Sequence, residues 1–247
     1  MVSNDVEQDV CEALLLTPKA RVIAPLVVWR RGADDYLLLT EPELGDTVLR
    51  HLTRMRLRAQ VEIAPEEHTS HVVLGGADGI PTAAYGMPAI EVLDAKLEPT
   101  LGEEELERLR VLAGSPRWGR EIDDRVLPAE AGLDETAISF TKGCYPGQEP
   151  VARQRYRGRV NRMLRLLEID SVEEPPYDAQ IFFEGKPVGR ITSTVRDNGR
   201  IVALAYVRTS VPDNAELKVD GDDMRPARFE RATSASAGQI GVPPVRP

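Results

Sequence analysis

The residues best suited to chemistry lie in one short segment, 141–149, which reads TKGCYPGQE. Two glycines and a proline around Cys144 predict a tight loop, not a helix. If the side chain of Lys142 converges on Cys144, its ammonium would favour the thiolate and lower the thiol pKa. The alternative is a buried structural cysteine beside a solvated lysine. The glycine-flanked setting favours a functional loop, as do three flanking polar side chains: Tyr145, Gln148 and Glu149.

Four arginines alternate with other residues directly downstream: Arg153, Arg155, Arg157 and Arg159. If this stretch is extended, a period of two places all four guanidinium groups on one face. Such a row suits a polyanion, either a polyglutamate tail or RNA phosphates. It equally suits a structural strand that pairs with acidic residues of a neighbouring domain, and the sequence favours neither interpretation.

Composition narrows the classes of protein. The 247 residues allow one large domain or two ordinary ones, and 42% hydrophobic with 29% charged residues is a globular balance. The net charge of −9 argues against direct nucleic-acid binding. No apolar run is long enough to span a bilayer, the acidic N-terminus does not resemble a signal peptide, and two cysteines make no disulfide framework. We therefore expect a cytoplasmic protein without a membrane partner.

The pattern of apolar residues predicts mixed strands and helices before residue 160. Strands are expected at 21–28, 35–40, 61–63 and 72–74, and helices at 42–59 and 102–114. Acidic residues in the first turn and arginines in later turns support the second helix. His68 and His71 lie beside two glutamates, but they lack HExxH order, so we expect no metal site.

After residue 160 the apolar period changes to two. Turn signals separate six expected strands: 162–170, 179–183, 187–195, 200–208, 215–219 and 225–230. This pattern predicts a small antiparallel β-barrel. The expected organisation is an α+β region at 1–158, the barrel at 159–231 and a disordered tail at 232–247.

The octet Lys142–Glu149, with Val151-Ala-Arg153 and Arg157-Gly158 after it, resembles the signature of the YgfZ family. Members are folate-binding proteins of iron–sulfur cluster assembly and repair, similar in fold to the glycine-cleavage T protein, an aminomethyltransferase. The similarity runs from about residue 3 to 230. Supporting matches are Leu14–Arg21, Arg110, Gly114, Pro116, Gly119, Asp123, Pro128–Glu130 and Gly132–Leu133.

The resemblance implies a mixed α/β folate-binding domain closed by a C-terminal antiparallel barrel. It implies tetrahydrofolate as cofactor and iron–sulfur client enzymes or assembly proteins as partners, with indirect support of tRNA-modifying iron–sulfur enzymes. Cys144 is then the reactive or cluster-contacting thiol, tuned by Lys142. The expected folate-binding residues are Arg110, Glu130, Lys142, Tyr145, Gln148 and Arg153. Family members begin about fifty residues earlier, so the folate domain is expected to be N-terminally shortened.

Four positions depart from the T protein. Ala24 and Pro25 stand where it carries an acidic pair, and neither side chain can accept a proton. Leu112 replaces its substrate-side glutamate, and Cys144 replaces an aspartate. These departures favour a non-enzymatic assembly factor. The alternative is an enzyme, a tetrahydrofolate-dependent aminomethyl or one-carbon transferase, and whether Cys144 contacts a cluster, carries a group or shapes the loop stays open.

Overall fold

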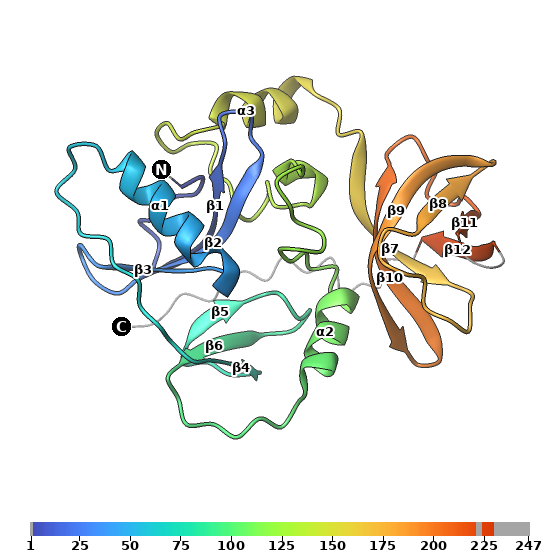
Figure 1. The fold of residues 1–247 in the computed structure, drawn as a ribbon, viewed down its shortest axis with the longest axis horizontal. Coiled ribbons are helices and arrows are strands. Elements are labelled where there is room, and N and C mark those ends of the chain that lie inside the picture. The colour runs from blue at the N-terminus through green and yellow to red at the C-terminus, as the bar shows by residue number, and fades with distance from the viewer. Residues whose placement is uncertain (1, 221–223, 230–247) are drawn as a thin grey trace.

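A computed structural model describes residues 2–220 and 224–229, so the expected tail at 232–247 lies outside the described residues. The chain forms two three-stranded sheets and a barrel, with a central irregular segment between them (Figure 1). The first sheet has the order β1 (Val10–Leu16), β2 (Val22–Arg30), β3 (Tyr36–Leu39), and the second β4 (Ser70–Leu74), β6 (Ala89–Leu93), β5 (Ile80–Thr82). The helices are η1 (Pro42–Leu44), α1 (Gly45–Met55), α2 (Glu103–Leu112), η2 (Pro128–Glu130) and α3 (Gln148–Arg157).

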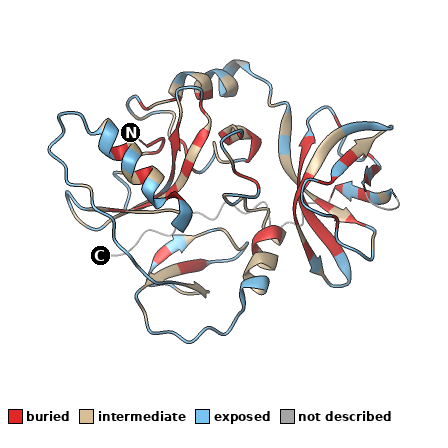
Figure 2. Cartoon of the chain, in the orientation of Figure 1, coloured by how far each residue is buried: buried red, intermediate tan, exposed pale blue. Residues whose placement is uncertain are grey.

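The first sheet is covered on both faces, which explains the continuous apolar run in β1. Leu15 and Leu26 point to one face and pack with Leu52 of α1. Leu14 and Val22 point to the other, where they meet the central segment and α3. Figure 2 shows this buried centre between the exposed outer surfaces of the helices.

Five of the six elements predicted before residue 160 are present, but strands β1, β5 and β6 were not predicted. The apolar stripe of α1 buries Val48 and Leu52, but the helix ends at Met55, before the expected residue 59. The following Leu57 has φ of 50°, a left-handed conformation that breaks the helix. No strand forms at 61–63, so that prediction was wrong. No helix in the described part of the chain is long and apolar enough to cross a membrane.

The C-terminal strands close into the predicted antiparallel barrel. Their order around it is β10, β7, β12, β11, β8, β9. Their bounds are β7 (Arg162–Ile169), β8 (Gln180–Phe183), β9 (Lys186–Asp197), β10 (Arg200–Arg208), β11 (Leu217–Val219) and β12 (Arg225–Phe229). Alternate residues such as Leu167, Ile181 and Ile191 fill the interior. The α+β class with a C-terminal barrel is confirmed.

The arginine-rich stretch after residue 150 is helical, which corrects the extended interpretation. Gln148–Arg157 forms α3, and its first residues belong to the segment expected to be a loop. Residues two apart on a helix point about 200° from each other, so Arg153 and Arg155 cannot share a face. The expected row of guanidinium groups therefore does not form.

Candidate functional site

The loop that carries Cys144 packs against the turn between β1 and β2. Gly147 has φ of 83°, and an added Cβ there would lie 2.6 Å from the carbonyl oxygen of Thr17. A glycine is thus required both by the backbone conformation and by the close approach. Tyr145 is buried against Leu14, Leu16 and their neighbours, whereas Cys144 is exposed. The loop therefore presents its thiol to solvent from a fixed base.

Lys142 fastens the same loop to the N-terminal segment. Its Nζ donates to the carbonyl oxygens of Val2 and Asn4, at 2.9 and 2.8 Å. Burial lowers the pKa of Lys142, while nearby Asp5 opposes the shift. Among the described residues no hydrogen bond joins Lys142 to Cys144, so the proposed tuning of that thiol stays a prediction. The contacts seen make Lys142 an anchor of the loop.

The hydroxyl of Tyr145 is the unusual polar group of this loop. It is buried and has no hydrogen-bond partner among the described residues. An unpaired buried hydroxyl costs stability, about 1–3 kcal/mol. Such a group is either tolerated for packing or kept for a ligand. Gln148 begins α3, and its backbone N–H donates to the Tyr145 carbonyl oxygen at 3.2 Å.

The other expected folate-binding residues are held in ion pairs. Arg153 is exposed on α3 and pairs with Glu149 at 2.8 Å. Glu130 of η2 is buried and pairs with Arg162 of β7 at 3.1 Å. Arg110 of α2 is buried and faces the barrel. The structure thus holds Lys142, Cys144 and Tyr145 in one loop with Gln148 at the start of the helix that follows, and it places Arg110 and Glu130 on surfaces packed against the barrel.

Arg110 belongs to a buried network that the sequence analysis did not identify. Its guanidinium pairs with Glu121 at 3.0 Å and with Glu107 at 2.8 Å, and it donates to Ser193 Oγ at 3.0 Å. Glu121 is fully buried and also accepts from Ser193 Oγ at 2.7 Å. The Glu121 carbonyl oxygen accepts from the hydroxyl of Tyr206 on β10 at 2.9 Å. The network joins α2 and the central segment to the barrel.

A cavity of about 310 Å³ lies beside this network, between the central segment and the barrel. We call it the barrel-side cavity. It is lined by Glu107, Arg117, Arg120, Glu174, Pro175, Tyr177 and the β9 residues 191–194. Its two arginines belong to the run Pro116-Arg-Trp-Gly-Arg120, in which Pro116 and Gly119 match the family but the arginines were not singled out.

His68 is part of an exposed chain of hydrogen bonds. Its Nδ1 lies 2.7 Å from Asp94 Oδ2, and its Nε2 lies 3.1 Å from Glu66 Oε2. Glu66 continues the chain to Arg31 at 2.8 Å, which lowers the Glu66 pKa to about 2. In the described ranges no group of three or more histidine, cysteine or acidic side chains is arranged to hold a metal ion. The chain of bonds links the β2–β3 hairpin to the second sheet.

His51 and His68 are expected to titrate on opposite sides of the usual histidine pKa of about 6.5. Hydrogen bonds to Asp94 and Glu66 raise the pKa of His68, whereas burial, with Arg54 nearby, lowers that of His51. The charged hydrogen bonds from His68 to Asp94 and Glu66 therefore contribute fully to stability below pH 6.5. That contribution is lost as the pH rises through the raised pKa of His68. Ring-proton NMR titration should show this order, and Asp94→Asn should lower the pKa of His68 but not of His51. Coincident titrations would contradict the bonding.

Comparison with known proteins finds relatives of similar sequence that cover most of the chain. No family model matches the chain. The chain is 26% identical to an uncharacterised protein of Haemophilus influenzae, over 88% of this chain and 84% of the relative. It is also 26% identical to the tRNA-modifying protein YgfZ of Cronobacter sakazakii, over 81% and 74%. An iron–sulfur cluster assembly factor IBA57 homolog of Pyricularia oryzae is 26% identical, over 75% of this chain and 57% of that protein.

The fold is that of the glycine-cleavage aminomethyltransferases. The T protein of Bartonella henselae superposes with a TM-score of 0.78 at 15% identity, over 91% of this chain and 75% of that one. At that identity the match speaks for the fold alone. Together with the relatives, it confirms the resemblance to the YgfZ family and to the T protein.

Proposed function

We propose that the chain is a tetrahydrofolate-binding accessory protein for iron–sulfur cluster assembly or repair, which indirectly supports tRNA-modifying iron–sulfur enzymes. The observation that carries the proposal is the Cys144 loop: an exposed thiol on a base fixed by Gly147, Tyr145 and Lys142. The relatives named for iron–sulfur assembly and for YgfZ support the same role.

The residues near the loop fit a reduced pteridine. Such a ring carries N–H and C=O groups at its edge, and the unpaired Tyr145 hydroxyl can bond one of them. Tetrahydrofolate would supply a carrier for one-carbon groups. The departures on β2 and α2 weigh against transfer of such a group here, because Ala24 is buried apolar surface and Leu112 packs with the barrel cluster. Neither position offers a proton acceptor.

Calorimetric titration with tetrahydrofolate under anaerobic conditions tests the proposal. We expect a micromolar dissociation constant, about −8 kcal/mol. Tyr145→Phe should weaken binding by about tenfold while leaving stability unchanged or slightly higher, since it removes a hydroxyl that has no hydrogen-bond partner in the part of the chain that the structure describes. Tyr156→Phe, on the exposed surface of α3, is the matched control. A folded chain that binds no tetrahydrofolate would overturn the folate part of the proposal.

A further inference from the structure

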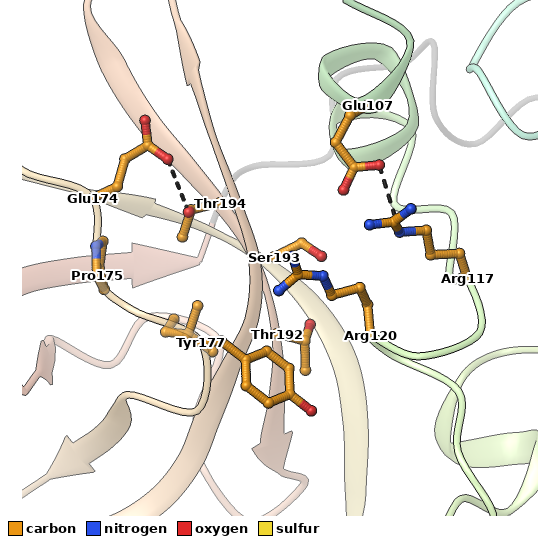
Figure 3. A pocket seen from close by; sticks show the side chains of 10 residues that line it. Glu107, Arg117, Arg120, Glu174, Pro175, Tyr177, Thr192, Ser193 and Thr194 are labelled. Atoms are coloured by element: carbon orange, nitrogen blue, oxygen red, sulfur yellow. Dashed lines mark hydrogen bonds and ion pairs between the residues drawn. The ribbon is translucent and has the colours of Figure 1, made fainter. Parts of the chain in front are cut away.

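Some polar groups that line the barrel-side cavity already donate hydrogen bonds within the protein, and others do not (Figure 3). Three hydroxyls of β9 each donate within the protein. Thr192 donates to the Leu204 carbonyl oxygen at 2.9 Å. Ser193 donates to Glu121 at 2.7 Å, and Thr194 to Glu174 at 3.0 Å. This wall of the cavity can therefore accept hydrogen bonds from a ligand but has no proton left to donate.

The arginines of the cavity, by contrast with the β9 hydroxyls, still have N–H groups free to donate. Among the described residues Arg120 has no hydrogen bond or ion pair, and its guanidinium lies 5.6 Å from the centre of the Tyr177 ring. Figure 3 shows its side chain extending between Tyr177 and Ser193. Within the described ranges, the Arg117 side chain makes only a long ion pair with Glu107, at 3.7 Å. Most of the N–H groups of both side chains are available.

The two carboxylates of the cavity do not supply the missing partners. Glu107 is paired with Arg110 at 2.8 Å, and Glu174 with Arg196 at 3.2 Å. Each acid thus has an arginine partner outside the cavity lining, and Arg110 is shared between Glu107 and Glu121. The donors left for an anion are those of the lining arginines, Arg117 and Arg120. Guanidinium groups bind carboxylate and phosphate through paired hydrogen bonds.

We propose that the barrel-side cavity binds the anionic group, a carboxylate or a phosphate, of a small molecule. Arg120 and Arg117 hold the anion, and the ring of Tyr177 packs on the carbon part next to it. The volume of about 310 Å³ is at the lower end of small-molecule sites. The inference rests on the free donors of the cavity and goes beyond the proposed role of the Cys144 loop.

Titration of the whole chain with inorganic phosphate and with glutarate, at low ionic strength, tests this site. We expect millimolar or tighter binding of at least one anion, weakened by added sodium chloride. Arg120→Gln should weaken it about tenfold or more with little change in melting temperature, because among the described residues the side chain has no hydrogen bond or ion pair to lose, only its contact with the Tyr177 ring. Arg125→Gln is the matched control, since Arg125 is exposed and pairs with Asp123 at 2.6 Å.

The outcomes separate the two sources of the anion. Tighter binding of phosphate identifies a phosphate ligand, and tighter binding of glutarate a carboxylate ligand; either supports the site. The proposal is overturned if a folded chain binds neither anion at about 10 mM. It is also overturned if Arg120→Gln and Arg125→Gln weaken binding equally, because the effect would then come from overall surface charge.

Discussion

Glu121→Ala is expected to lower the free energy of unfolding by about 3–5 kcal/mol. Glu121 is fully buried and is the acid that faces Arg110 from the central segment. Its loss leaves a buried guanidinium short of charge compensation and removes the acceptor of the Ser193 hydroxyl. Equilibrium unfolding in urea, followed by the fluorescence of the two tryptophans, measures the change.

A matched control separates the stability cost of leaving a buried charge from the cost of losing an exposed ion pair. Glu149 pairs with Arg153 at 2.8 Å on the exposed surface of α3, so Glu149→Ala should cost under about 1 kcal/mol. Pairing Glu121→Ala with Arg110→Met should recover part of the loss, since the double variant no longer buries a guanidinium that has lost one of its two acidic partners. Equal effects of the two single alanine variants would contradict the role given to the network.

The acidic residues at the start of α2 and the arginines in its later turns identified that helix from local sequence. The period-two pattern identified the barrel strands, because a closed barrel buries alternate residues whatever its strand order. The α3 helix was missed because its alternating arginines imitate a strand. A glutamate and a proline in its first turn, Glu149 and Pro150, were the helix-start signals that compete with that pattern.

The candidate site was predictable only where its residues are neighbours in sequence. The Cys144 loop is one octet, so its glycines and thiol could be read together. Glu121 contacts Ser193, 72 residues away, and the Tyr206 hydroxyl, 85 residues away. No motif records such pairs, and only the closing of the barrel on the central segment brings them together. The same holds for Arg120 and Tyr177 in the barrel-side cavity.

Cys144→Ala is expected to abolish activity in cells while leaving the fold intact. The assay is the activity of an iron–sulfur, tRNA-modifying enzyme in a strain that lacks its own YgfZ-like protein and expresses this chain. We expect the variant to fall to the level of the empty vector, because the proposed role uses the thiol directly. The side chain is exposed, so its stability should change by no more than about 0.5 kcal/mol.

The second cysteine provides the control. Cys11 is buried in β1, and burial, with Asp5 nearby, raises the pKa of its thiol, so it is a poor nucleophile at neutral pH. Cys11→Ala should therefore keep activity in cells at equal protein level, although it removes core packing. Wild-type activity in Cys144→Ala would show that the thiol has no direct role and that Cys144 only occupies a place in the loop. Loss in both variants would point to folding, which the unfolding measurement detects independently. Only loss confined to Cys144 assigns the function to the exposed thiol.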